Sequence, residues 1–557
     1  MTISTVNTLT IEVKIKGAGS YQVAPGILLG DLCINIQKKW PYPIVAGIIC
    51  NTLRDLHYGL ETDCEVELVD ISTEMGLRIY RRSVAFLLIK ACRDLYPQRT
   101  LMIKHTLSNG LFCEFLHEAS TDAEIEQIQA RIQAIVDRDL PIHRYLINRD
   151  EACQIFAGQG QGDKVKLLEY RDKVNVHIYE MDGFKEYFYG YMAYRTGILG
   201  KFKLLNYPPG MVLRTPEKDD IDLVQPYHEQ KKLTMIHQEA KAWAEMLQTP
   251  HLAALNEIIE WGDIDDIIKV NEALHEKKIA YIADSICNNP DIRLVLIAGP
   301  SSSGKTTFAQ RLLIQLRVNG RRPVSISMDN YFVDRCHTPR DGSGDYDFES
   351  LEAMNLDFFN DHLNRLINNE ELEIPVYNFK KGCCEERGVM IKVPPGEPII
   401  IEGIHGLNDR LTWRIPRERK FKIYVSALTP LNLDYSNRIP TTDCRLIRRI
   451  IRDIRIRGYA ALDTIKCWPS VRRGEKKNIF PFQENADVMF NSSLVYELSV
   501  LKPYAEPLLQ GISNEHPEHV EARRLLRFLS YFRAIEPTNI PPNSILREFI
   551  GGSWFKE

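Results

Sequence analysis

The amino-acid sequence predicts a multidomain protein in which α+β units come first and an α/β domain with a parallel sheet follows. Three observations lead to this fold class. A chain of 557 residues is too long for one hydrophobic core. Its first part mixes short strands of alternating apolar and polar residues with helices, which is typical of α+β modules. From residue 291 onward, apolar strands alternate with helical segments, and this order favours a parallel sheet.

The order of these patterns divides the chain into five parts. Residues 1–70 predict a small α+β module, with strands in IEVKIK, PIVAGIICN and CEVELVDI and a helix in DLCINIQKKW. Residues 71–234 predict a second α+β domain with two long helices, RRSVAFLLIKACRDLYP and DAEIEQIQARIQAIVDRDLP. Residues 235–290 are mostly helical and polar, and we expect them to connect to an α/β domain at 291–502. Residues 503–557 predict a helical extension with a docking segment.

The composition is that of an ordinary soluble protein, with 44% hydrophobic and 26% charged residues. A net charge of −4 gives no overall attraction to nucleic acid or anionic membranes, although a local basic patch for RNA stays compatible with it. No apolar run approaches the roughly 20 residues of a membrane span, and the first residues lack the pattern of a signal peptide. The cysteines form no C-x-x-C pair, which favours reduced thiols. We therefore expect a cytoplasmic protein with no membrane partner.

A phosphate-binding loop is the clearest motif in the chain. GPSSSGKTT, directly after the apolar run LVLIA, matches G-x-x-x-x-G-K-[ST]. Glycines let successive backbone N–H groups turn toward phosphates, and the helix that follows presents its positive end to them. In this motif Lys305 reaches the β/γ oxygens and Thr306 binds Mg²⁺. The expected ATP-binding residues are Gly299, Pro300, Ser301, Ser302, Ser303, Gly304, Lys305, Thr306 and Thr307.

Four further motifs follow the loop in order: SISMDNYF, PVYNF, IIIEGIHGL and RLIRRIIRDIRIRG. Together with the loop they resemble the uridine kinase and phosphoribulokinase family of P-loop nucleoside kinases, over about residues 291–500. A GTPase would carry an NKxD-type motif, which the sequence lacks. Asp341 to Gly344 fits DxxG, but it stands in a predicted loop, and we interpret it as coincidence.

The resemblance assigns roles to three acids. Asp329 follows the second strand of this domain, where it would accept the proton of the attacking sugar hydroxyl. An N-cap is the alternative role for Asp329. Glu402 follows the strand PIII and would assist Mg²⁺ beside Thr306. Asp347, in GDYDF, matches the aspartate that holds the ribose diol, although a simple turn aspartate is nearly as well supported.

The resemblance also assigns roles to an arginine-rich segment. Arg449, Arg452 and Arg457 match arginines that contact the substrate or close over the phosphates, with Arg452 and Arg457 in the catalytic set. A solvated basic helix is the alternative, but arginines at 445, 448, 449, 452 and 455 cover more than one face, so some must meet acids or anions. Tyr377 keeps the family tyrosine beside the base, whereas the base-contacting histidine falls near Gly382.

The N-terminal half carries a second resemblance. Residues 1–70 resemble the TGS β-grasp domain of threonyl-tRNA synthetases, most clearly in PIVAGIICNTLRDLHYGL. Residues 71–234 resemble the domain of those enzymes that hydrolyses mischarged tRNA, through RRSVAFLLIKACRDLYP and YFYGYMAYRTGILGKFKLL. The metal-type ligands of that domain are replaced here by Arg82, Phe86, Phe188 and Met192. We therefore expect a fold without its hydrolytic chemistry, which holds RNA or a nucleoside or braces the kinase.

The sequence as a whole predicts an ATP- and Mg²⁺-dependent kinase that phosphorylates the 5′-hydroxyl of a ribonucleoside. The alternative is a regulatory ATPase that binds RNA or tRNA through its synthetase-like half. Asp329 and Asp347 favour the kinase, because an ATPase needs no sugar pocket.

Overall fold

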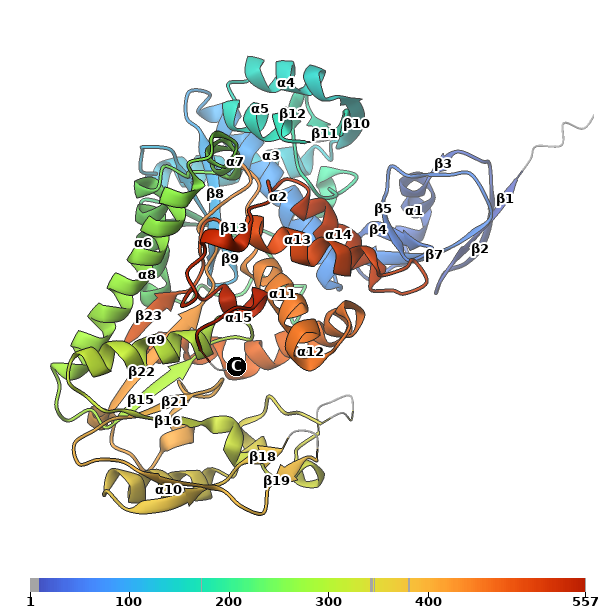
Figure 1. Ribbon diagram of the computed structural model, residues 1–557. Helices are drawn as coiled ribbons and strands as arrows, with labels where there is room; N and C mark the ends of the chain where they lie inside the picture. Colours follow the sequence, from blue (N-terminus) through green and yellow to red (C-terminus); the bar gives the residue numbers. More distant parts are fainter. Residues whose placement is uncertain (1–9, 172, 341–343, 345, 379–380, 556–557) are drawn as a thin grey trace, which may run out of the picture.

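The computed structural model describes residues 10–555 except 172, 341–343, 345 and 379–380 (Figure 1). The first unit is a five-stranded sheet of order β2-β1-β7-β4-β5 with one helix packed against it. The alternation in IEVKI places Ile11, Val13 and Ile15 in the core and the residues between them toward solvent. Its elements are β1 (Ile11–Ile15), β2 (Gly19–Val23), β3 (Ile27–Leu28), α1 (Leu29–Gln37), β4 (Ile44–Ile49), β5 (Thr52–Asp55), β6 (Gly59–Leu60) and β7 (Cys64–Asp70).

The second unit is built around the long helix α2, whose core-facing residues are almost continuous. Thr73 caps its start by accepting from the backbone N–H of Gly76, and Thr121 with Glu124 forms a capping box at the start of α3. Two antiparallel sheets complete the unit, of order β13-β14-β9-β8 and β10-β11-β12. Its elements are α2 (Glu74–Leu95), β8 (Leu101–Leu107), β9 (Gly110–Phe115), α3 (Asp122–Asp137), β10 (His143–Asn148), α4 (Arg149–Gly158), α5 (Gly162–Glu169), β11 (Asn175–Met181), β12 (Phe184–Glu186), β13 (Lys203–Tyr207) and β14 (Gly210–Arg214).

Three helices join this unit to the last part of the chain: α6 (Lys231–Met246), α7 (Leu252–Trp261) and α8 (Ile264–Cys287). They are more than a tether. Leu233 and Ile236 of α6 share a buried cluster with Val212 of the second unit and Ala298 of the following sheet. The connector therefore contributes to the core on both of its sides.

The α/β part contains a parallel sheet of order β16-β21-β15-β22-β23, which confirms the predicted fold class. Every residue of its central strand LVLIA is buried, as expected for a parallel strand covered on both faces. The sheet elements and their helices are β15 (Leu294–Ala298), α9 (Lys305–Val318), β16 (Val324–Ser327), β21 (Ile399–Glu402), β22 (Lys420–Ser426), α11 (Thr441–Arg452), α12 (Ala461–Asn478) and β23 (Val488–Asn491). Beside the sheet stand α10 (Leu356–Ile367), β17 (Glu371–Ile374), β18 (Tyr377–Asn378), β19 (Cys383–Cys384) and β20 (Val389–Lys392).

The C-terminal segment runs back to the centre of the molecule (Figure 1). It contains α13 (Glu497–Gln510), α14 (His519–Leu529) and the short α15 (Arg547–Ile550). Ile545 lies against Gly304, since a Cβ on that glycine would meet the Ile545 side chain at 2.6 Å. The end of the chain is thus packed on the phosphate-binding loop. In the part of the chain that the structure describes, no helix has the length and apolarity to cross a membrane.

Candidate active site

The loop between β15 and α9 has the backbone of a phosphate-binding turn. Ser302 and Gly304 adopt left-handed conformations, with φ of 58° and 82°. Gly299 lies so close to the backbone carbonyl of Val425 on the neighbouring strand that a side chain would collide with it. The loop then enters α9 at Lys305, so the helix N-terminus faces the space that the loop encloses.

The Lys305 ammonium lies inside this loop with a neutral partner. Its Nζ donates to the carbonyl of Pro300 at 3.2 Å. Burial lowers the pKa of Lys305, and the carboxylates of Glu402, Glu548 and Asp329 act in the opposite direction. A partly buried ammonium whose hydrogen-bond partner is a neutral carbonyl is stabilised when an anion arrives. The position therefore fits a phosphate group.

Thr306 and Glu402 provide oxygen atoms at the same place. The Thr306 hydroxyl donates to Glu402 Oε1 at 2.8 Å. Burial raises the pKa of Glu402, while Lys305 and the Thr306 hydrogen bond lower it. Across the described residues there is no cluster of three or more His, Cys, Asp or Glu that could hold a metal. Mg²⁺ in phosphate sites is held by only one or two protein oxygens and by the phosphates, so Thr306 and Glu402 fit such an ion.

Asp329 lies at the same edge of the sheet, in a 3-10 turn (Met328–Tyr331) directly after β16. The cap of this turn is Ser327, whose hydroxyl accepts from the backbone N–H of Asp329 at 3.2 Å. The alternative role of Asp329 as the cap is therefore wrong. Asp329 is exposed at the surface of the site; the protein packed around it raises the pKa of its carboxylate, while Lys305 and Arg457 lower it. A raised pKa makes a carboxylate a better proton acceptor.

Two arginines of α11 support the loop from behind. Arg445 donates to Glu475 and Arg448 to Glu497, and all four side chains are buried. The same guanidinium groups donate to loop carbonyls, Arg445 to Ser301 at 3.0 Å and Arg448 to Ser302 at 3.4 Å. Arg445 and Arg448 thus pair with buried acids, as was expected for some of the arginines of this segment.

The predicted substrate-facing arginines follow on the next face. Arg449 donates to the hydroxyl of Ser301 at 2.9 Å and to Asp453 at 3.1 Å. Arg457, in the π-helical turn after α11, donates to the other oxygen of Asp453 at 3.2 Å. Arg452 donates to Glu548 at 3.2 Å. Arg449 is therefore linked to the phosphate loop through Ser301. Arg452 is linked to it through Glu548, which also accepts from the hydroxyl of Thr307.

The predicted sugar and base residues lie in the segment after β16. Asp347 is part of a turn, with its N–H bonded to the carbonyl of Pro339 at 2.7 Å and its carboxylate 3.8 Å from Lys477. The buried ring of Tyr377 packs against Phe332 at 5.7 Å. A Cβ at Gly382 would meet Arg335 Nε at 2.9 Å, so a guanidinium fills the space beside this glycine. Of the DxxG pattern, Asp341 to Ser343 lie outside the described residues.

Two acids of this site were not predicted. Glu548 accepts from the hydroxyl of Thr307 at 2.9 Å and from Arg452, and it comes from the C-terminal segment, which matches no motif. Glu349 has a pKa raised to about 7, first by burial and next by the charge of Glu475, while Arg449 lowers it. Its place directly after GDYDF was the one sequence signal available for it.

The positions that matched hydrolytic ligands form part of an apolar core. Phe86 and Phe188 make an edge-to-face contact at 5.8 Å, and Met192 is fully buried. Arg82 donates to the carbonyl of Tyr191 at 2.7 Å. Arg78, near the start of α2, pairs with Glu521 at 3.3 Å, so it connects this helix to α14.

Comparisons with known proteins relate the chain to two kinds of protein. Residues 294–498 match the Phosphoribulokinase / Uridine kinase family, so the kinase-like similarity lies in the C-terminal part of the chain. The N-terminal region matches threonine–tRNA ligases. That of Francisella tularensis subsp. novicida is 26% identical over 195 residues, which are 35% of this chain and 31% of the ligase. That of Acidithiobacillus ferrooxidans is 32% identical over 162 residues, 29% of this chain and 25% of the ligase. The chain thus spans less than a third of the ligases it matches.

Solved structures of kinases are also similar to this chain. The structure of a possible uridine kinase from Bacillus stearothermophilus is 19% identical, with 39% of this chain and 98% of that chain covered and a TM-score of 0.26. A putative fructose transport system kinase from Silicibacter is 18% identical, with 38% and 98% covered and a TM-score of 0.26.

Proposed function

We propose that this protein is an ATP- and Mg²⁺-dependent kinase that phosphorylates the 5′-hydroxyl of a ribonucleoside. The observation that supports it most is the convergence of Lys305, Asp329 and Glu402 at the carboxyl edge of one parallel sheet. These are a cation for phosphate, a carboxylate for the hydroxyl proton and a carboxylate beside the Mg²⁺-binding threonine. The match of residues 294–498 to a kinase family supports the same proposal.

In the proposed reaction, bound ATP supplies the phosphoryl group and Mg²⁺ balances the phosphate charge. Asp329 accepts the proton of the attacking hydroxyl, a role for which its raised pKa suits it. Lys305 holds the β/γ oxygens, and Arg449, Arg452 and Arg457 stabilise the charge that spreads during transfer. The buried pairs of Arg445 and Arg448 keep the loop in place, so that the donors are positioned before the substrate binds.

The nucleoside part of the proposal depends on the segment that carries Asp347 and Tyr377. A carboxylate can accept from both hydroxyls of a ribose diol, and a buried aromatic ring provides a flat wall for a base. Arg335 beside Gly382 places a guanidinium where the family histidine would stand. We therefore expect a requirement for the ribose diol and a base preference that differs from that of ordinary uridine kinases.

A second candidate is a regulatory ATPase that binds RNA or tRNA, favoured by the match of the N-terminal region to threonine–tRNA ligases. Measuring ATP consumption with nucleosides and, separately, with tRNA distinguishes the two. Stimulation by ribonucleosides, weaker by about ten- to hundredfold with 2′-deoxyuridine, supports the kinase. Stimulation by tRNA with no response to any nucleoside would replace it with the ATPase.

A further inference from the structure

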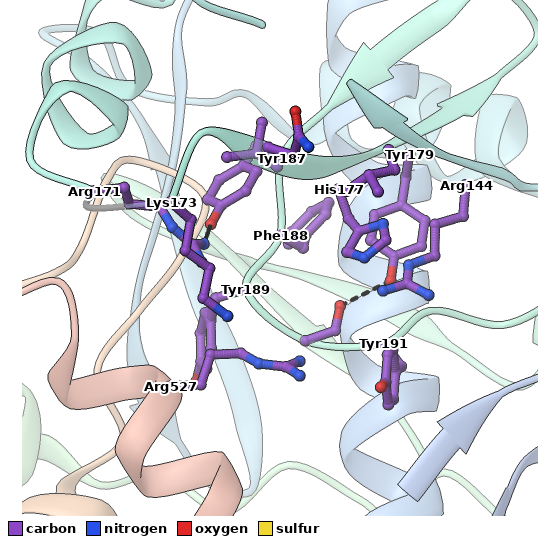
Figure 2. A pocket seen from close by; sticks show the side chains of 14 residues that line it. Arg144, Arg171, Lys173, His177, Tyr179, Tyr187, Phe188, Tyr189, Tyr191 and Arg527 are labelled. Atoms are coloured by element: carbon purple, nitrogen blue, oxygen red, sulfur yellow. Dashed lines mark hydrogen bonds between the residues drawn. The ribbon is translucent and has the colours of Figure 1, made fainter. Parts of the chain in front are cut away.

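A cavity of about 190 Å³ lies in the second unit, apart from the phosphate loop (Figure 2). It is enclosed by β10, β11, the segment 187–191 and the C-terminal helix α14. Lys173, Tyr189 and Arg527 stand on one side of it, and Arg144, His177 and Tyr191 on the other (Figure 2). Arg527 lies beyond residues 294–498, the range that matches the kinase family.

None of the described residues that line this cavity has a carboxylate. Four of them are cations: Arg144, Arg171, Lys173 and Arg527. Arg144 is paired outside the lining with Asp55 at 2.9 Å. The guanidinium of Arg171 donates to the hydroxyls of Tyr187 and Tyr531, the latter at 2.7 Å, and lies over the Tyr531 ring at 5.0 Å. Arg527 makes a cation–π contact with Tyr191 at 5.7 Å and has no carboxylate partner among the described residues. The cavity therefore lacks negative charge.

The titratable groups respond to this excess of charge. The pKa of Lys173 is lowered, first by burial and then by the charges of Arg171, Arg527 and Arg523. The pKa of His177 is lowered to about 4, first by burial and then by the positive charge of Arg144, so its ring is neutral at pH 7. An anion in the cavity would offset the repulsion between these cations.

Aromatic rings form the rest of the wall. Tyr179 and Phe188 are buried, and Tyr189 and Tyr191 are partly open to the cavity. Such faces stack on planar groups, and guanidinium groups beside them bind phosphate. Of the four positions that matched hydrolytic ligands, Phe188 alone lines the cavity. Phe86 and Met192 are buried in the core.

We propose that this cavity binds a free nucleotide of the nucleoside 5′-monophosphate class. The base stacks on Tyr189, because the guanidinium groups of Arg144 and Arg527 already lie over the Tyr191 ring. The phosphate is held by Arg527, Lys173 and Arg171. The small volume suits one base with its phosphate better than a polynucleotide. This site does not depend on the proposed kinase activity, because it uses none of the phosphate-loop residues.

The test is isothermal titration calorimetry of the full chain, which measures the affinity for AMP and for UMP and compares it with the affinity for adenosine and for inorganic phosphate. Arg527→Glu reverses a charge in the cavity, and Lys203→Glu is the charge-reversal control in the same unit, because Lys203 is exposed and outside the lining. We expect Arg527→Glu to weaken the binding of a monophosphate by about tenfold or more, and Lys203→Glu to weaken it by much less. Adenosine and phosphate alone should each bind more weakly than AMP.

Hydrogen exchange locates the ligand independently of the kinase assay. The monophosphate that binds should protect peptides covering 173–191 and 523–531 at concentrations that leave 299–307 unchanged. The proposal is overturned if these peptides are not protected, or if the two variants lose affinity equally. It is also overturned if phosphate alone binds as well as AMP, or if a single-stranded RNA protects the peptides and the monophosphates do not.

Discussion

Glu548 joins the end of the chain to the phosphate site, and its charge can be removed with little change in shape. Glu548→Gln keeps the size of the side chain but removes its ion pair with Arg452, which is 3.2 Å long in the wild type. It also places an amide beside the Thr307 hydroxyl, which in the wild type donates to a carboxylate oxygen at 2.9 Å. The Arg452 and Glu548 side chains are only 16% and 9% exposed, so solvent screens the pair weakly. Losing one charge of such a pair while keeping a hydrogen-bonding group costs about 1–3 kcal/mol.

Because this loss acts on a docked segment, local opening is the quantity to measure. Hydrogen exchange of the amides in 544–551 should be about five- to hundredfold faster in Glu548→Gln than in the wild type. Glu536→Gln is the control, because Glu536 is exposed in the same segment. Unchanged exchange in Glu548→Gln, or an equal increase in Glu536→Gln, would refute the reasoning that Glu548 fastens the segment to the loop.

Three further predictions address the two halves of the chain. Lys305→Ala and Asp329→Asn should each reduce nucleoside phosphorylation by about 100-fold or more, and a folded Asp329→Asn enzyme within a few-fold of wild type would remove Asp329 from its role. The metal-ligand positions of the hydrolytic domain hold Arg82, Phe86, Phe188 and Met192. Metal analysis of the purified full chain should therefore find no stoichiometric zinc, and the protein should not deacylate seryl-tRNA(Thr). Bound zinc or deacylation would contradict the loss of the hydrolytic site. Finally, the raised pKa of Glu349, about 7 against 4.5 in the unfolded chain, means that stability is lost as pH rises from about 4.5 to 7. Glu349→Gln should therefore stabilise the protein by about 1–3 kcal/mol at pH 8 and by little at pH 4, as thermal unfolding at the two pH values will show; an equal gain at both would exclude titration of Glu349 as the cause.

The sequence predicted the parallel sheet and the phosphate loop because both are encoded locally. LVLIA is apolar enough to be a buried strand, and the glycine pattern after it is required by backbone geometry at Gly299 and Gly304. The separation of a synthetase-like half from a kinase half followed from ordered motifs. These features need no knowledge of which segments meet in three dimensions.

What the sequence could not provide depends on contacts between distant segments. The ion pair of Arg452 with Glu548 joins residues 96 positions apart, and no spacing rule connects them. The basic cavity likewise needs Arg527 to meet Tyr191, which belongs to another unit. Asp329 shows a local limit: Ser327, two residues earlier, takes the capping role, and only the backbone conformation distinguishes the two.

The most direct test of the proposed function follows the γ-phosphate of labelled ATP in the presence of Mg²⁺ and a single ribonucleoside. We expect the label to appear in a nucleoside 5′-monophosphate, with uridine, cytidine, adenosine, guanosine and inosine compared by kcat/KM, and the label to stay in ATP with Lys305→Ala. Release of the label only as inorganic phosphate, at a rate that no nucleoside changes, would contradict the account.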